Sequence, residues 1–308
     1  MTASFRIAQP SDGFAIDAMT RAEAQQLFDW AAAEGWNPGL ADLDIAWATD
    51  PDAFIALRET ATDALAGGGT IFRHGPGYGF MGLFILRSDL RRQGLGQRLW
   101  HWRRDRLLAR LESGATIGMD GVFEMAAFYE RGGFAPVYRD LRFQGLVPTS
   151  VSSSGPLEDP VVALGPGDLA AIEALDRRCF PCPRTDFLAR WLGQPGAVLR
   201  GIRADASEGA TGDALAAFGM TRPCRNGVKV GPLYAETPDQ AEAILRALMA
   251  ETGGLQMQWD LPEANPAAVA LAHKIGFEEV FGCVRQYHGP APDIALGQLY
   301  GVTSLEFG

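Results

Sequence analysis

The chain has 308 residues, of which 47% are hydrophobic and 21% are charged, and this length and composition are typical of a packed soluble protein with two domains. The net charge of -10 argues against a general nucleic-acid binder, because affinity for phosphate backbones comes mainly from clustered lysine and arginine. We find no apolar run of membrane-spanning length and no targeting pattern at the N-terminus, so we expect a cytoplasmic protein with no membrane or nucleic-acid partner.

Two further compositional features concern ligands. The acidic surface suits a cationic substrate, whereas arginines crowd residues 87–110, where we expect an anionic ligand. The close cysteine pair, Cys179 and Cys182, has no second Cys-x-x-Cys or histidine pair to complete a zinc site. We expect no metal and reduced thiols, with a redox pair as the alternative.

In chain order, the pattern predicts a strand at residues 5–8 and a helix over 13–33 capped by Ser11 or Asp12. A glycine- and proline-containing loop follows at 34–39, and then a helix at 51–57. Residues 78–86 are apolar on both faces, as in a buried central strand. A polar turn over 87–94 leads into a long helix at 95–111. A strand at 115–119, a helix at 124–131 and a strand at 137–143 then close the first half.

A Ser/Gly/Pro segment at 148–156 has almost nothing to bury and is the natural linker. After it the pattern restarts with a strand at 161–164 and helices at 169–179 and 186–192. Both halves end on the same sequence of features: a helix, a Gly-Phe pair, and an arginine eight residues after the phenylalanine, Arg142 in the first half and Arg285 in the second. We infer a duplicated unit, with domains at 1–147 and 158–308 joined by a linker at 148–157.

The junction Arg91-Arg-Gln-Gly-Leu-Gly96 between the central strand and the long helix has the design of an anion site. A helix N-terminus carries free N–H groups and the positive end of the helix dipole, and glycines let backbone amides approach a phosphate. No Gly-Lys-Ser/Thr follows, and the third glycine and ribose-binding acid of a dinucleotide site are absent. The alternative is a tight turn with solvated arginines.

This loop resembles the Arg/Gln-x-x-Gly-x-Gly/Ala pyrophosphate loop of the GNAT superfamily of acyl-CoA-dependent N-acyltransferases, and residues 126–134 resemble its second signature, a helix with a tyrosine shortly before Gly-Phe. Over nearly its whole length the chain is similar to a bacterial subgroup of tandem GNAT proteins with a degenerate C-terminal half. The resemblance implies an α/β (α+β) fold with two tandem GNAT-like domains, each a mixed, mostly antiparallel central sheet flanked by helices.

The resemblance also implies acetyl-CoA as co-substrate, without a metal, and direct attack of an amine on the thioester in a ternary complex. It places the acyl and pantetheine contacts at the end of the central strand and the pyrophosphate at the loop. One departure is Phe123, which stands where many members carry an asparagine. The implied cofactor-binding residues are Phe84, Ile85, Leu86, Arg91, Arg92, Gln93, Gly94, Leu95, Gly96, Gln97 and Phe128.

Tyr129 matches the family tyrosine that protonates the departing CoA thiolate, and we predict that role for it; the alternative is a helix tyrosine packed on the sheet. The general base stays open among Glu34, Asp42, Asp44 and Asp120, each of which is also a plausible surface carboxylate.

The second half lacks the phosphate loop, since Glu236 at its strand-to-helix junction would repel a diphosphate, and Ala272 stands in the place of Tyr129. By resemblance, this half packs on the first and helps to form the acceptor pocket. The implied acceptor residues are Trp36, Asn37, Asp44, Arg222 and Tyr234, with Trp259, Asp260 and Asn265 as further candidates.

The predicted function is transfer of an acetyl group from acetyl-CoA to a primary amine of a small molecule, by a monomer or homodimer. Two alternatives remain: a non-catalytic acyl-CoA sensor or scaffold, and an acyltransferase for a longer acyl chain or an O-acceptor.

Overall fold

The structure is a computed structural model that describes residues 13–150, 161–205 and 214–308. The expected strand at residues 5–8, the expected caps Ser11 and Asp12, and most of the expected linker lie outside the described residues. Within the described part of the chain, no helix is long and apolar enough to cross a membrane.

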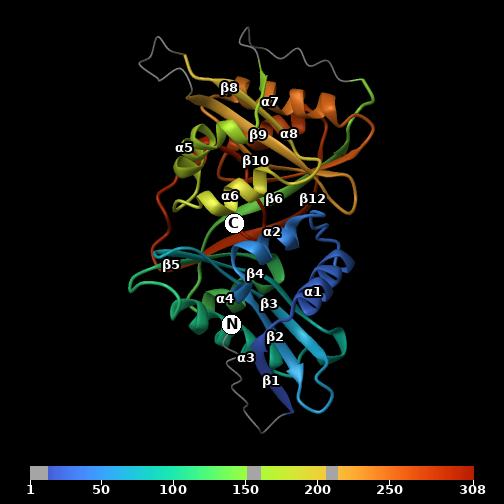
Figure 1. The fold of residues 1–308 in the computed structure, drawn as a ribbon, viewed down its shortest axis with the longest axis vertical. Helices are drawn as coiled ribbons and strands as arrows, with labels where there is room; N and C mark the ends of the chain where they lie inside the picture. Colours follow the sequence, from blue (N-terminus) through green and yellow to red (C-terminus); the bar gives the residue numbers. More distant parts are fainter. Residues whose placement is uncertain (1–12, 151–160, 206–213) are drawn as a thin grey trace.

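The described strands form one mixed, mostly antiparallel sheet that runs through two lobes (Figure 1). In each lobe one neighbouring pair is parallel, β4 with β5 and β10 with β11. This confirms the expected fold class. The first five strands are β1 (Phe14–Ala18), β2 (Phe54–Glu59), β3 (Leu65–Gly75), β4 (Tyr78–Leu86) and β5 (Thr116–Val122), and the second lobe contributes β7 (Val162–Ala163), β8 (Val198–Arg203), β9 (Leu215–Pro223), β10 (Val228–Ala235), β11 (Gln256–Pro262) and β13 (Leu299–Gly301).

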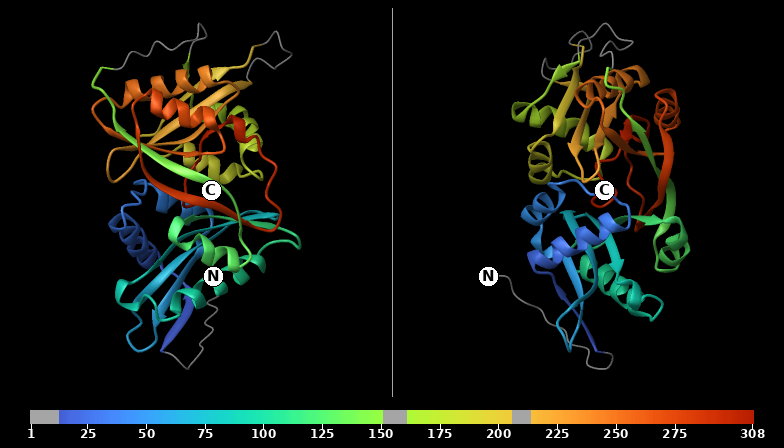
Figure 2. Two further views of the ribbon diagram at one scale, coloured as in Figure 1. Left: turned by 180° about the vertical axis from the view of Figure 1, so that it is seen from behind. Right: turned by 90° about the vertical axis from the view of Figure 1, so that its right-hand side faces the viewer.

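In each half a long strand follows the Gly-Phe pair, and these two strands are exchanged between the lobes. Strand β12 (Glu278–His288) lies between β5 and β6 (Ala135–Leu146), and β6 lies between β12 and β11. Figure 2 shows these two strands crossing between the lobes. The prediction that the strand at 137–143 closes the first half is therefore wrong, because that strand pairs with β11 and β12 of the second half.

The repeated arginines hold this exchange together. Arg142 on β6 makes a two-pronged ion pair with Asp260 on β11, with N–O distances of 2.6 and 2.8 Å. Arg285 on β12 does the same with Asp120 on β5, again at 2.6 and 2.8 Å. Both pairs are buried. Each exchanged strand thus carries a positive charge that an aspartate on the neighbouring strand of the other half neutralises. Removing one partner would leave a buried charge uncompensated.

Eight α-helices are described, packed on the sheet: α1 (Arg21–Ala33), α2 (Asp42–Thr49), α3 (Leu95–Leu108), α4 (Ala126–Arg131), α5 (Leu169–Cys179), α6 (Thr185–Leu192), α7 (Pro238–Glu251) and α8 (Pro266–Lys274). Two predictions in the N-terminal part are wrong. Residues 13–33 hold β1 as well as α1, which starts after Thr20 in a capping box with Glu23. The helix expected at 51–57 is a short 3-10 turn and then β2, which pairs on both sides and is buried there.

The last seven residues, 302–308, are buried between the two lobes, where the C label lies in Figure 2. Both lobes hold this C-terminal tail. From the second, the Val302 amide donates to the carbonyl of Asp260 and the Arg184 guanidinium to that of Gly308. From the first, the His74 ring lies 2.7 Å from the Phe307 carbonyl.

His74 predicts how stability depends on pH. Its half-buried ring is surrounded by Phe72, Tyr78 and Phe180, and burial together with the Arg184 charge lowers its pKa to about 3. The unfolded histidine keeps a pKa near 6.5, so the unfolded state binds the proton first as pH falls. The unfolding free energy that the neutral His74 contributes is fully present above pH 6.5. It is lost as pH falls below 6.5, by up to ~1.4 kcal/mol per pH unit.

We expect His74→Gln, which keeps a side-chain N–H for the Phe307 carbonyl, to lose less unfolding free energy than the wild type between pH 7.5 and pH 4.5. Urea unfolding at both pH values measures the difference, and contributions from other titrating groups cancel between the two proteins. Equal losses in the two proteins would contradict a neutral His74.

Candidate active site

The site begins where β4 and β5 stop pairing. Their parallel ladder ends at Met81 and Met119. Just beyond, Leu83 and Phe84 on β4 lie opposite the single residue Gly69 of β3, which is a β-bulge with Leu83 in the left-handed region at φ 49°. A bulge leaves backbone groups without ladder partners, and here it lies at the mouth of the gap between the two strands.

The side chain of Arg103, on α3, holds the backbone of β3 and β4 at the bulge. Its guanidinium donates to the carbonyls of Thr70 and Gly82, both at 2.6 Å, and any side chain at Gly69 would collide with it. The residue is 1% exposed, no carboxylate of the described residues forms an ion pair with it, and burial lowers its pKa to about 9. It is therefore a buried positive charge directly beside the gap.

The glycine loop closes one end of the gap. Gly94 precedes α3 with φ 82°, and no atom lies within 4 Å of a Cβ built on it. No side chain caps the helix, so its first N–H groups face the open space that an anion would fill. Two of the predicted loop residues turn elsewhere: Gln93 donates to the Asp89 carbonyl, and Leu95 packs in the core.

A cavity of about 520 Å³ runs from this loop through the gap between β4 and β5. Its loop end includes most of the predicted cofactor residues, and its far end is built by both lobes. From the loop end it is lined by Arg91, Arg92, Gly94, Gly96, Gln97, Phe128, Leu86, Ile85 and Phe84, and at the far end by Trp36, Arg142, Phe281, Cys283, Leu305 and Glu306.

Tyr129 of α4 lines the middle of the cavity and is 4% exposed. Its ring lies over Gly121 of β5, where an added Cβ would come within 2.6 Å of the ring. Burial raises the pKa of Tyr129 to about 12, although the Arg103 charge acts in the opposite direction. The phenol therefore keeps its proton at neutral pH and is able to donate it.

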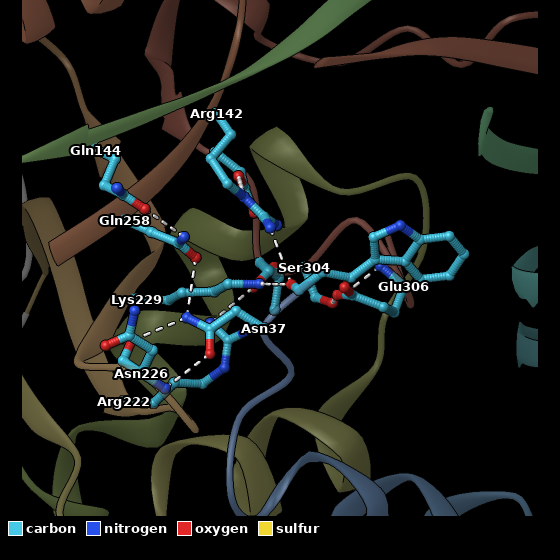
Figure 3. Close-up of polar contacts among 12 residues, drawn as sticks. Asn37, Arg142, Gln144, Arg222, Asn226, Lys229, Gln258, Ser304 and Glu306 are labelled. Atoms are coloured by element: carbon cyan, nitrogen blue, oxygen red, sulfur yellow. Dashed lines mark hydrogen bonds and ion pairs between the residues drawn. The ribbon is translucent and has the colours of Figure 1, made fainter. Parts of the chain in front are cut away.

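The far end of the cavity is organised by charged groups of the second lobe. Arg142 and Lys229 both donate to the Trp36 carbonyl at 2.9 Å (Figure 3), which fixes the loop that carries the Trp36 ring. The Arg142 guanidinium also lies 5.5 Å from the centre of the Phe281 ring. Two aromatic side chains are thus held at this end by one buried arginine.

Comparison with known proteins agrees with this geometry in both lobes. Residues 21–134 match the model of the Acetyltransferase (GNAT) family, and residues 172–301 match a second model, described as Acetyltransferase (GNAT) domain. The chain carries two GNAT domains in tandem.

Known proteins are similar to this chain over most of its length. The Holothin acyltransferase of Pseudoalteromonas sp. (strain SANK 73390) is 24% identical over 99% of this chain and 98% of its own. A putative acetyltransferase from Pyrococcus horikoshii has the same fold with a TM-score of 0.77, 20% identity and 98% of each chain covered. A tandem GNAT protein from the clavulanic acid biosynthesis pathway has a TM-score of 0.61 at 15% identity, covering 90% of this chain and 99% of that one.

The gap that holds the cavity in the first GNAT domain is filled in the second. Strand β13 pairs with β10 at Leu233 and Tyr234, beside an irregularity like that of β4, and the following Val302 amide donates to Asp260 of β11. The N-terminus of α7 is also satisfied, by a capping box between Thr237 and Gln240. The space between the parallel strands of this domain is therefore taken by the chain itself.

Several residues that the sequence analysis placed at the acceptor lie outside the cavity. Asp44 is exposed and pairs with Arg21. The other four are held inside the protein: Asn37 bonds to Gln258 and Asn226, Arg222 to Asp42, Tyr234 to Asp176, and Asn265 caps α8. Trp259 is core, and Asp260 is the partner of Arg142. Of the acceptor candidates, Trp36 alone lines the cavity.

The far-end residues that sequence reasoning missed are Arg142, Phe281, Cys283, Leu305 and Glu306. The repeat had marked Arg142, but as evidence of duplication and not as part of a site. The others stand on an exchanged strand or in the C-terminal tail, and no sequence motif marks them.

Proposed function

We propose that the first GNAT domain transfers an acyl group, acetyl in the simplest case, from acyl-CoA to a primary amine of a small molecule. The observation that carries this proposal is a single cavity that joins the glycine loop at α3 to an aromatic end built by both domains, with Tyr129 between them. A cavity of this kind would bring a donor and an acceptor together, as direct transfer requires.

The chain's own groups fit the steps of direct transfer. The loop amides and the start of α3 would hold the pyrophosphate, and N–H groups of the bulge at Leu83 and Phe84 would stabilise the oxyanion formed on the thioester carbonyl. Tyr129 would give its proton to the departing thiolate. The open space around Gly94 supports a site for an anionic donor.

A covalent acyl-enzyme is disfavoured by the state of the cavity cysteine. Cys283 lines the cavity, but burial and the nearby carboxylates of Asp120 and Asp140 raise its pKa well above the usual range. A thiol is a far weaker nucleophile than a thiolate, so direct attack by the amine accounts better for this site.

The far end favours a small acceptor with an apolar body. Trp36, Phe281 and Leu305 form the apolar part of its wall, beside the charged residues Arg142 and Glu306. Apolar walls with a small number of placed polar groups are typical of small-molecule sites. The relative named Holothin acyltransferase supports acyl transfer as the reaction of this site.

The test is an assay of acyl transfer by the purified protein, in which release of the CoA thiol is measured. Acetyl-CoA and hexanoyl-CoA are each supplied with a panel of benzylamine, tryptamine and aniline, and with the corresponding alcohols. We expect amine-dependent thiol release and an N-acylated product by mass spectrometry. Binding of acyl-CoA without release for any acceptor would favour a sensor, and ester products would establish an O-acyltransferase.

A further inference from the structure

Three carboxylates line the cavity, and they differ in what neutralises them. Glu34 pairs with Arg91 at 2.5 Å, and Asp120 is held by both nitrogens of the Arg285 fork. Glu306 has no ion pair with any described residue. Its charge interacts at longer range with the buried cations Arg142, Arg222 and Lys229. It is therefore the carboxylate of the described cavity wall that has no direct ion-pair partner.

The immediate surroundings of Glu306 leave room for such a contact. Its side chain accepts a hydrogen bond from the Ser304 hydroxyl through one oxygen, and among the described residues its other oxygen has no hydrogen-bond partner (Figure 3). The residue is only 5% exposed. An oxygen on the cavity wall without a protein partner is available to accept a hydrogen bond from a ligand or water.

The position of Glu306 is close to the reacting centre. Its carbonyl packs directly on Gly82, the residue before the bulge, where any side chain would collide with it. The C-terminal tail around it is fixed, since the Gly308 amide donates to the Ser304 carbonyl and the Ser304 hydroxyl also accepts from the Glu306 amide. Its place beside β4 is therefore set by packing and does not depend on a mobile end.

We propose that Glu306, supplied by the tail of the second GNAT domain, binds the acceptor's amino group and takes its proton during transfer. This rests on the proposed function. A bound ammonium first gives one proton to water, and the lone pair of the neutral amine then forms the C–N bond. The C–S bond breaks as the tetrahedral intermediate collapses, the extra proton left on the nitrogen passes to the Glu306 carboxylate, and Tyr129 protonates the thiolate. Both residues return to their starting states by proton exchange with water.

The role gives the second domain a part in transfer that needs no phosphate site of its own. Its own strand gap is closed by β13, and the same segment continues into the tail that carries Glu306 into the first domain. The substrate class that follows is a primary amine with an aromatic or aliphatic body small enough for the space between Trp36 and Phe281.

The experiment compares wild type, Glu306→Gln, Glu306→Asp and the control Glu112→Gln, an exposed carboxylate outside the cavity. Acetyl-CoA affinity is measured by isothermal titration. Benzylammonium affinity is measured in the presence of CoA, and kcat and KM are measured with benzylamine. We expect Glu306→Gln to lose about 100-fold or more in kcat/KM and to bind benzylammonium more weakly. Acetyl-CoA affinity stays unchanged, Glu306→Asp is intermediate, and the control is like wild type.

The outcomes separate this inference from the proposed function. Equal kcat/KM and equal benzylammonium affinity in wild type and Glu306→Gln would overturn the role of Glu306 while leaving acyl transfer intact. If the wild type binds acetyl-CoA but transfers an acyl group to no amine, the proposed function is overturned. If benzylammonium affinity is then also unchanged in Glu306→Gln, the amine-binding role of Glu306 is overturned as well. Loss of acetyl-CoA affinity in Glu306→Gln would show a structural role and also contradict the inference.

Discussion

Gly94→Asp is expected to weaken acetyl-CoA binding severely. The new carboxylate would stand at the N-terminus of α3, in the open space where the pyrophosphate is proposed to lie. Two like charges held a few ångströms apart near a protein surface repel by several kcal/mol, and each 1.4 kcal/mol weakens binding tenfold. We therefore expect a loss of about 100-fold or more in affinity, measured by isothermal titration.

Gly94→Asn is the matched control, because it has nearly the same size and asparagine and aspartate tolerate the left-handed conformation at φ 82° to a similar degree. The neutral variant should lose no more than about tenfold, from backbone strain alone. If both variants lose the same affinity, the loss comes from shape and not from charge, and the loop is not a pyrophosphate site. If neither loses affinity, acyl-CoA binds elsewhere.

The position of the glycine loop was predictable because it belongs to a contiguous stretch with its own physical signature, whereas Tyr129 was singled out by the resemblance of residues 126–134 to the second GNAT signature. A buried strand, two glycines and a helix start follow one another from residue 78 to residue 96, so the local sequence determines the geometry. The same holds for β4, whose predicted bounds at 78–86 are those observed.

The exchange of β6 and β12 was not predictable from pattern. Both strands carry an arginine at the same place, and both possible hosts, β5 and β11, carry an aspartate to receive it. An ion pair of Arg142 with Asp260 therefore neutralises the buried arginine as well as an ion pair with Asp120 would. Which of the two ion pairs forms is set by the three-dimensional arrangement of the strands. The residues at the acceptor end of the cavity depend on that arrangement.

Asp120 shows what this means for the catalytic base. It was a candidate from sequence because it lies near loops expected to face the acceptor site, yet the exchanged Arg285 neutralises it and Asp140 lies buried beside the same guanidinium at 3.3 Å. Burial raises the pKa of Asp140 well above its usual range. These carboxylates belong to the structural link between the domains, which leaves the proton of the amine to another group.

Tyr129→Phe is expected to lower kcat by about 100-fold to 10,000-fold, the range typical of a lost general acid, while acetyl-CoA affinity stays the same. The substitution removes one oxygen and keeps the ring on Gly121, so the fold and the donor site are preserved. Steady-state kinetics with benzylamine and isothermal titration with acetyl-CoA measure the two quantities separately.

The control is Tyr138→Phe, which removes a buried tyrosine hydroxyl that has no hydrogen-bond partner among the described residues, on β6 and outside the cavity wall. It should keep full kcat. The pKa of Tyr129, raised to about 12, also sets the direction of the pH dependence. An acid works while it holds its proton, so no loss of rate from Tyr129 is expected as pH rises from 7 to 10. A basic limb within that range that disappears in Tyr129→Phe would mean that the phenol titrates far below 12, and unchanged kcat in Tyr129→Phe would mean that the thiolate takes its proton from water.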